Sequence, residues 1–372
     1  MENTINEIRE KDIIIDRYSF ENDRIQKSIS YKLGMCITYI PRRLRRILSS
    51  MYHIVSGYRL YATLLKIYGV NVNILYTVPF GTGDYYICGL YLKNWRKKNN
   101  IENYVFLVPD RGAERRVINL FESFWDHTYE CKKHWRDICS LNAFNTLLNY
   151  EFQNIKYLHH REPAFKNTSF RLTYDRLQGF KGWNMVDYYL TYGYSLPLDS
   201  PKDIPSFTDS SLIEDKYFGG EYKLKKGRTV ILSPNSTGLS RFSLPNAFWK
   251  ELSDFFVSAG FIVVTNCFGK EKPIEGSYAI PIPYTEIVPL AELCGYFVGI
   301  RSGLCDIVSS AKCKKHIIHT YYATFWPIGE SITYTGLNNM CLCDDAFEYE
   351  YNPRSGYSEI MEHIVSNVCG DR

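Results

Sequence analysis

The sequence predicts an α/β protein made of two doubly wound domains that face a cleft, with extra helices at the N-terminus. Three observations lead to this fold class. The chain has 372 residues, more than one hydrophobic core usually serves, so two domains are expected. Short apolar strands alternate with helices in two separate stretches. Polar loops follow several of these strands, where ligands bind in open parallel sheets.

Composition narrows the class of protein further. The formal net charge is only +4, too weakly basic for nucleic-acid binding, so we expect no nucleic-acid partner. The 11 cysteines are scattered, and the chain opens without a signal-peptide pattern, which predicts a reduced, cytoplasmic protein. No run of about 18 apolar residues is present to span a bilayer.

A basic amphipathic helix is predicted within residues 1–70. Arg42, Arg43, Arg45 and Arg46 interrupt an apolar run, and apolar residues continue at helical spacing to Leu60. Two interpretations stay open. The helix either packs on its own domain with a solvated basic face, or contacts an anionic membrane, which would make the protein peripheral on the inner face.

The first α/β stretch contains strands at 72–78 and 103–108 and helices at 85–98 and 113–124. An aromatic, helix-like middle follows at 127–194. Prolines in the segment 195–206 then mark the best domain boundary. We therefore expect an acceptor-side domain over 1–200, including the helical N-terminal extension.

The second α/β stretch alternates more clearly. It is expected to form a nucleotide-binding domain over 201–350, followed by a C-terminal helix within 351–372. The helix that ends before Gly260 should stop there, because glycine tolerates the left-handed conformation. The predicted strands are 229–232, 261–265, 277–282, 296–300 and 315–320, and the predicted helices are 247–259, 285–294, 303–311 and 358–368.

The segment Arg301-Ser302-Gly303 follows the strand 296–300 and opens a helix. Free amides at a helix start bind anions, and an arginine adds a planar two-pronged grip on phosphate. These residues therefore predict a phosphate site. The competing interpretation is that Ser302 caps the helix and Arg301 pairs with a surface carboxylate.

A second polar loop, 233–243, lies at the end of the strand 229–232. Ser236 and Arg241 in this loop would reach the same anion from the opposite side. The two loops together predict a cleft for a diphosphate. A solvated loop without a ligand is the alternative.

Three carboxylates complete the candidate site. Asp84 stands at the start of the helix after the first strand, where it either interacts with the helix dipole or accepts a proton from an attacking hydroxyl. Glu286 either caps its helix or binds ribose or sugar hydroxyls. Asp306 should avoid phosphate because like charges repel, so we expect it to contact a sugar hydroxyl or its own helix start.

Metal and cofactor chemistry are not expected. No Asp-x-Asp pair lies between the predicted domains, and Asp344-Asp345 is interpreted as a solvated acidic loop. His127, Cys131, His134 and Cys139 lack the CxxC or HExxH spacing of zinc sites. His316 and His319 are interpreted as structural. The chain also lacks GxSxG and GxxxxGK[ST] motifs, which argues against serine hydrolases and P-loop NTPases.

Three short motifs in this order resemble the GT-B glycosyltransferases, in particular the bacterial heptosyltransferase family. They are Gly83-Asp84-Tyr85-Tyr86, Pro234-Asn235-Ser236 with Arg241, and Arg301-Ser302-Gly303-Leu304-Cys305-Asp306. The resemblance covers residues 70–125 and 228–320. Two positions depart from the family pattern, because Arg301 replaces its aspartate and Asp306 its histidine. The arginine is similar to the fucosyltransferase-like branch, which makes GDP-fucose one donor among several.

The resemblance implies two Rossmann-like domains and a metal-independent, Leloir-type transferase. The second domain would bind a nucleotide-diphosphate sugar through Ser236, Arg241, Glu286, Arg301, Ser302, Gly303 and Asp306. The acceptor, a growing cell-surface glycan or its lipid-linked precursor, would face the catalytic base Asp84. Two alternatives remain: an epimerase that uses the same cleft without an acceptor, and a non-catalytic protein that binds glycans or a partner enzyme.

Overall fold

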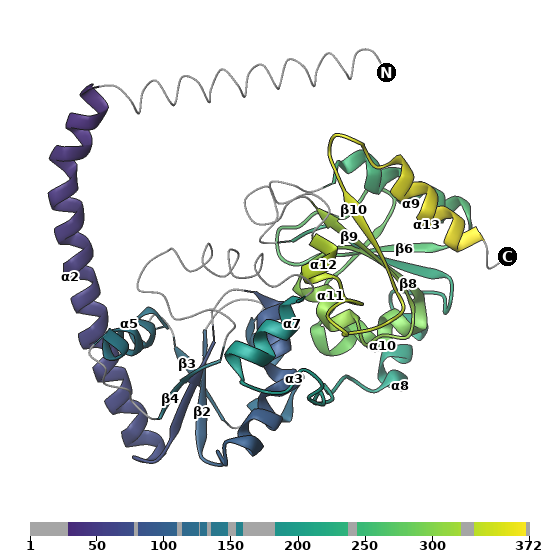
Figure 1. The fold of residues 1–372 in the computed structure, drawn as a ribbon. Coiled ribbons are helices and arrows are strands. Elements are labelled where there is room, and N and C mark those ends of the chain that lie inside the picture. Colours follow the sequence, from purple (N-terminus) through teal and green to yellow (C-terminus); the bar gives the residue numbers. More distant parts are fainter. Residues whose placement is uncertain are drawn as a thin grey trace.

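The computed structural model shows two lobes, each built on one parallel β-sheet (Figure 1). The structure describes residues 29–77, 81–109, 114–125, 127–131, 135–147, 154–158, 183–236, 244–320 and 331–369. The first sheet has the strand order β3-β2-β1-β4, and the second has the order β10-β9-β8-β5-β6-β7. Every pairing between these named strands is parallel, and helices cover both faces, as predicted for doubly wound domains.

The first lobe is a four-stranded sheet between two helical layers. Side chains alternate along β1, so Ile74 packs toward α2 and α5 while Leu75 joins the cluster under α3. The α2 residues Leu60 and Leu64 are buried in the first of these layers. The elements of this lobe are α2 (Ile29–Tyr68), β1 (Asn73–Tyr76), α3 (Thr82–Lys98), β2 (Tyr104–Pro109), α4 (Glu114–Ile118), η1 (Glu122–Phe124), β3 (Thr128–Cys131), α5 (Trp135–Leu147), β4 (Ile155–Tyr157), α7 (Met185–Tyr188) and η2 (Tyr189–Gly193).

The second lobe has a six-stranded sheet whose central strand β5 is buried along its whole length. Val230 and Leu232 face the layer of α9 and α13, and Ile231 faces α10 and α11. The elements of this lobe are α8 (Ser210–Ile213), η3 (Glu214–Gly219), β5 (Thr229–Ser233), α9 (Asn246–Ser258), β6 (Ile262–Asn266), β7 (Tyr278–Ile280), α10 (Tyr284–Cys294), β8 (Gly295–Ile300), α11 (Gly303–Val308), β9 (Lys314–Thr320), α12 (Ser331–Thr335), β10 (Ala346–Tyr351) and α13 (Ser358–Cys369).

Most predicted elements of the second lobe are confirmed. Gly260 follows α9 with a φ of +84°, the left-handed conformation expected of it. The strand 315–320 is present as β9, but it is not the last strand, because β10 pairs beside it. The residues from Phe347 to Tyr351 alternate aromatic and acidic side chains, a pattern typical of a strand, and the sequence analysis missed it.

The helix-like prediction for 127–194 is wrong in part. This stretch contains the strands β3 and β4, which are only four and three residues long and show no clear alternation. The predicted helix 113–124 is divided into α4 and η1. Residues 159–182 lie outside the described part of the chain.

The domain boundaries stay a prediction, although contacts indicate to which lobe the elements near these boundaries belong. Tyr194 bonds to Cys88 of α3, so the segment before residue 200 is tied to the first lobe. Ile364 of α13 packs with residues of α9 in the second lobe. β10 ends at Tyr351, one residue past the predicted boundary.

The two lobes touch where the first turns of α3 and α11 meet (Figure 1). A Cβ added to Gly303 would lie 2.3 Å from the backbone nitrogen of Gly83 and 2.7 Å from Cβ of Thr82. Only a residue without a side chain allows this approach. The connecting segment bonds to both lobes, because the amide of Ser206 donates to Leu120 O and that of Thr208 donates to Thr285 O.

We predict that Gly303→Ala separates the lobes and destabilises the protein by roughly 1–3 kcal/mol, the usual cost of overpacking. Urea unfolding monitored by circular dichroism measures this change. Gly219→Ala is the matched control, because a Cβ there would meet nothing closer than Glu214 O at 4.0 Å. Equal stability of both variants and the wild type would contradict the close contact of α3 and α11.

Within the described residues, no helix is both long and apolar enough to cross a membrane.

Candidate functional site

Five of the eight predicted site residues lie near the contact between the lobes: Asp84, Arg301, Ser302, Gly303 and Asp306. β1 leads into α3 through Gly81, whose φ of +104° suits glycine, and Asp84 lies in the first turn of α3. β8 leads into α11 through Arg301 and Ser302. Because both strands are parallel members of their sheets, the turn after each lies at a carboxyl edge, and the two edges face each other here.

Arg301 is held by three hydrogen bonds within the second lobe. Its Nη2 donates to Oδ1 of Asp306 at 2.6 Å, its Nε to Thr335 O at 2.7 Å and its Nη1 to Ser302 O at 2.6 Å. The side chains of Arg301 and Asp306 are only 12% and 4% exposed. The partner carboxylate is therefore buried, which corrects the interpretation that Arg301 pairs with a surface carboxylate.

Within the protein, Asp306 pairs with Arg301, which lies five residues earlier in the chain. The contact of Asp306 with a sugar hydroxyl of the donor stays a prediction. Oδ2 of Asp306 points to the other lobe, because a Cβ added to Gly83 would lie 2.2 Å from that oxygen. Asp306 thus links the ion pair of the second lobe to the first turn of α3.

Burial raises the pKa of Asp306 to about 6, although Arg301 opposes this shift, and the nearby carboxylates of Asp84 and Glu348 increase it. A carboxyl with such a pKa binds and releases a proton close to neutral pH. Asp84 and Asp306 therefore interact electrostatically across the lobe contact.

Asp84 accepts a hydrogen bond from the hydroxyl of Tyr189, which is buried in η2. This bond ties the candidate base to a segment about a hundred residues later in the chain. Sequence reasoning missed Tyr189, and nothing distinguishes it among the 31 tyrosines of the chain.

Ser302 does not cap α11. Its backbone is extended, and its side chain makes no capping hydrogen bond to the described helix; its Oγ lies 3.8 Å from Sγ of Cys305. The interpretation that Ser302 serves only as a cap is therefore wrong. Ser302 and Gly303 are both partly exposed beside Thr82 and Gly83.

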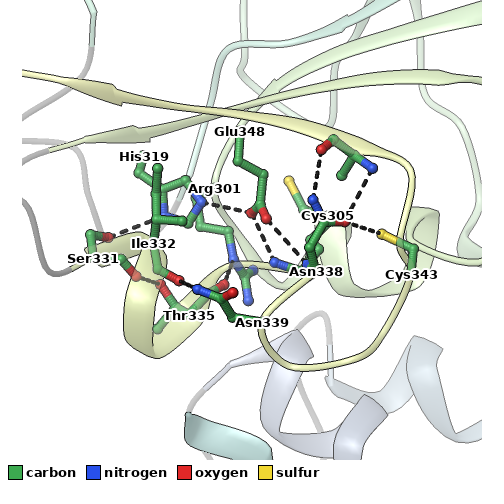
Figure 2. Close-up of polar contacts among 12 residues, drawn as sticks. Arg301, Cys305, His319, Ser331, Ile332, Thr335, Asn338, Asn339, Cys343 and Glu348 are labelled. Carbon is green, nitrogen blue, oxygen red and sulfur yellow. Dashed lines mark hydrogen bonds and ion pairs between the residues drawn. The ribbon is translucent and has the colours of Figure 1, made fainter. Parts of the chain in front are cut away.

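A polar network surrounds the turn whose Thr335 carbonyl accepts a hydrogen bond from Arg301 (Figure 2). Glu348 accepts from the amides of Leu337 and Asn338 at 2.8 and 3.1 Å, and it lies 3.0 Å from Nε2 of His319. Nδ1 of His319 lies 3.1 Å from Oγ of Ser331. These contacts fix both ends of the turn that presents the Thr335 carbonyl to Arg301.

The charges of this network follow from its environment. Burial lowers the pKa of His319. Burial opposes ionisation of Glu348, yet the hydrogen bonds from His319, Leu337 and Asn338 lower its pKa overall. Burial thus favours the neutral form of His319, and the hydrogen bonds favour the charged form of Glu348. Sequence analysis missed Glu348 because it missed β10.

The remaining predicted residues are not all brought together. Glu286 accepts from Lys216 Nζ at 2.7 Å and from the Tyr217 hydroxyl at 2.6 Å, so its partners belong to η3 rather than to the lobe contact. Ser236 is partly buried three residues after β5, whose last residue Ser233 pairs with Gly299 of β8. Arg241 lies outside the described residues.

The histidine and cysteine candidates form no metal site in the described part of the chain, where no three His, Cys, Asp or Glu side chains could hold an ion together. His134 lies outside that part. His127 stacks on Tyr104, with 4.3 Å between ring centroids. Nδ1 of His316 lies 2.9 Å from the Tyr349 hydroxyl, as expected for a structural residue. The absence of a metal requirement stays a prediction.

Comparison with known proteins identifies the fold. No protein-family model matches the chain, and no curated protein matches it in sequence. The structure resembles ADP-heptose lipopolysaccharide heptosyltransferase II from E. coli with a TM-score of 0.51 and 13% identity, over 80% of this chain and 98% of that chain. The two-domain GT-B fold predicted from the resemblance to heptosyltransferases is thereby confirmed.

Two further solved structures are similar at lower scores. A glycosyltransferase of family 9 from Veillonella parvula has a TM-score of 0.46 and 12% identity, over 78% of this chain and 90% of that chain. E. coli heptosyltransferase WaaC with ADP has a TM-score of 0.47 and 11% identity, over 80% of this chain and 99% of that chain.

We predict that Asp306→Asn changes the pH dependence of stability. In the folded protein the pKa of Asp306 is raised from 3.8 to about 6. The protonated carboxyl therefore adds to the free energy of unfolding at low pH, and this contribution is lost as the pH rises through 6. Asparagine mimics the protonated carboxyl. The stability of the wild type relative to Asp306→Asn should therefore fall by about 2 kcal/mol between pH 4.5 and pH 7.5.

Urea unfolding at several pH values measures this difference. Asp344→Asn is the control, because Asp344 is exposed. A stability difference between the wild type and Asp306→Asn that stays constant with pH would show that Asp306 titrates like an ordinary surface carboxyl.

Proposed function

We propose that this protein is a glycosyltransferase that moves a sugar from a nucleotide-diphosphate sugar to a growing cell-surface glycan or its lipid-linked precursor. One observation carries the proposal. The lobe contact places Asp84 of the first lobe close enough to the Arg301–Asp306 pair of the second to influence its ionisation. An acid–base group on one side and a fixed cation on the other are what such a transfer needs.

Asp84 is proposed as the general base. It is partly exposed in the first turn of α3, where the positive end of the helix dipole favours its ionised form. The Tyr189 hydroxyl donates to its Oδ1 and orients the carboxylate. An ionised, oriented carboxylate can take the proton of an attacking acceptor hydroxyl.

Arg301 is proposed to bind the diphosphate. Its described bonds to Asp306, Thr335 and Ser302 use three of its five N–H groups and fix the plane of the guanidinium. Fixed donors stabilise the negative charge that grows on a leaving nucleotide without reorganising during the reaction. Ser302, Gly303, Ser236 and Arg241 belong to the same proposal as further donor contacts.

The proposed reaction is metal-independent, because guanidinium and amide groups would supply the positive charge. No separate cofactor is required beyond the donor. E. coli heptosyltransferase II, whose fold this chain shares, is an ADP-heptose enzyme, which supports a nucleotide sugar as the donor class. A lipid-linked acceptor also agrees with a peripheral location on the inner face of a membrane.

The donor class can be tested by thermal unfolding with UDP, GDP, ADP and CMP. One nucleotide should raise the melting temperature, because a ligand at about a hundred times its Kd stabilises the folded state by about 2.7 kcal/mol. The double variant Arg301→Gln/Asp306→Asn removes both buried charges together and should abolish this stabilisation.

The matched control is Lys250→Gln/Asp254→Asn, which removes an ion pair on the outside of α9. It should respond to the nucleotide like the wild type. If no nucleotide stabilises the wild type, or if Arg301→Gln/Asp306→Asn responds fully, the donor site is assigned wrongly.

We predict that Asp84→Asn keeps nucleotide binding and lowers sugar transfer by roughly a hundredfold or more, as expected for a lost general base. The assay follows nucleotide release from the stabilising nucleotide sugar, with a lipid-linked glycan extract as the acceptor. Tyr189→Phe removes only the orienting hydrogen bond and should cause a smaller loss. Undiminished transfer by Asp84→Asn would exclude it as the base.

A further inference from the structure

The helix α2 packs on the first lobe through one of its faces. Leu60 and Leu64 of this face are fully or almost fully buried. His53 and Ser56 contact the buried carboxylate of Asp137, each at 2.6 Å. Next to them Gly57 lets the helices approach, because a Cβ there would lie 2.4 Å from the carbonyl oxygen of Asp137 in α5.

The opposite face of α2 is apolar and exposed. Its residues recur at intervals of four, three, four and three positions, so they form one stripe along the helix. Their exposed fractions lie between 41% and 58%. The stripe consists of Leu44, Leu48, Met51, Val55 and Tyr58.

The stripe runs along the outer side of the molecule. α2 lies at the margin of the first lobe, and its N-terminal half extends beyond the sheet that its C-terminal half covers (Figure 1). With a period of 3.6 residues, the stripe lies about half a turn from Leu60 and Leu64. The packing on α5 therefore leaves the aliphatic side chains of this face exposed, while the Tyr58 hydroxyl at its C-terminal end donates to Oδ1 of Asn145 in α5 at 3.4 Å.

The sequence of α2 is strongly basic. Its 40 residues include Lys or Arg at positions 32, 42, 43, 45, 46, 59 and 66 and contain no Asp or Glu. Arg45 and Arg59 are exposed and flank the stripe. An apolar face with cationic side chains beside it is complementary to an anionic partner with an apolar interior.

A second copy of the same helix fits this face poorly. The four-three spacing suits a coiled coil, in which Arg45 and Arg59 would flank the seam. The partner helix would offer these arginines no anion, because α2 has no acidic residue. Like charges along a seam oppose pairing, whereas anionic lipid headgroups neutralise them.

We propose that the stripe of α2 and its flanking arginines dock on an anionic lipid bilayer. The helix would lie in the plane of the interface, with its apolar side chains below the headgroups and its arginines among the phosphates. The inference deepens the proposed function, since it names the surface that would bring the enzyme to a lipid-linked acceptor. It does not depend on the donor site.

The experiment measures flotation of the full-length protein with vesicles of phosphatidylcholine, with and without phosphatidylglycerol. The wild type should float only with the phosphatidylglycerol vesicles, and added salt should weaken this binding. Leu48→Glu/Val55→Glu should abolish it, because both side chains would carry charge into the interface. Both residues are exposed, so the fold should persist.

Two further variants separate the contributions. Arg45→Ser/Arg59→Ser should weaken binding by on the order of tenfold or more, from about fivefold for each lost cation near the surface. Val257→Glu is the matched control, because Val257 is a 50% exposed apolar residue on α9 of the other lobe. It should float like the wild type.

Three results would overturn the proposal. The first is that the wild type does not float with phosphatidylglycerol vesicles at low salt, and the second is that Leu48→Glu/Val55→Glu still floats. The third is that light scattering shows a dimer of the wild type but a monomer of this variant, which would assign the stripe to a second copy. Nucleotide-induced stabilisation of the same variants keeps the two proposals apart. If flotation fails while nucleotides still stabilise the protein, only the proposal for α2 is wrong. If no nucleotide stabilises the protein while it still floats, only the proposed donor site is wrong.

Discussion

The contact between Gly83 and Gly303 is the constraint on which the rest of the site depends. Two helices that start at the carboxyl edges of different sheets can touch only if neither first turn carries a side chain at the point of approach. This contact brings Asp84 and Asp306 within electrostatic reach of each other. It also joins the apolar layers on the facing sides of the two sheets into one buried cluster.

The ion pair beside this contact is costly to bury and is therefore surrounded by partners. A buried pair of charges stabilises a protein only when the remaining polar groups are satisfied. Arg301 meets that condition through Thr335 O and Ser302 O. The neighbouring Glu348, which is not part of the pair, has partners of its own in two amides and His319. The raised pKa of Asp306 shows that its desolvation is only partly offset. An incoming diphosphate, as proposed, would bring negative charge close to Asp306 and would favour protonation of this carboxyl.

The helix α2 shows a different use of charge. Its buried face is held by Asp137, a carboxylate that α5 supplies, because α2 contains no acid of its own. Its exposed face has no such complement within the described part of the chain. Cationic side chains beside an exposed apolar stripe are stable in water, yet they gain most next to an anionic surface. One face of α2 therefore packs on the first lobe, and the opposite face is proposed to bind an anionic lipid surface.

The sequence by itself determined the alternation of strands and helices. Buried parallel strands such as β5 and β8 are continuous apolar runs, and Gly260 terminates a helix through a local conformational preference, so both are visible in a short window. The Arg301-Ser302-Gly303 turn and Asp84 were found for the same reason, because turns at strand ends carry a local composition. Only the tertiary structure decided which side chains meet. The Tyr189–Asp84 bond and the contact of Glu348 on β10 with His319 on β9 join distant segments whose local sequences do not predict the pairing. Arg301 and Asp306 are only five residues apart, yet it is the packing that buries both charges and makes them pair.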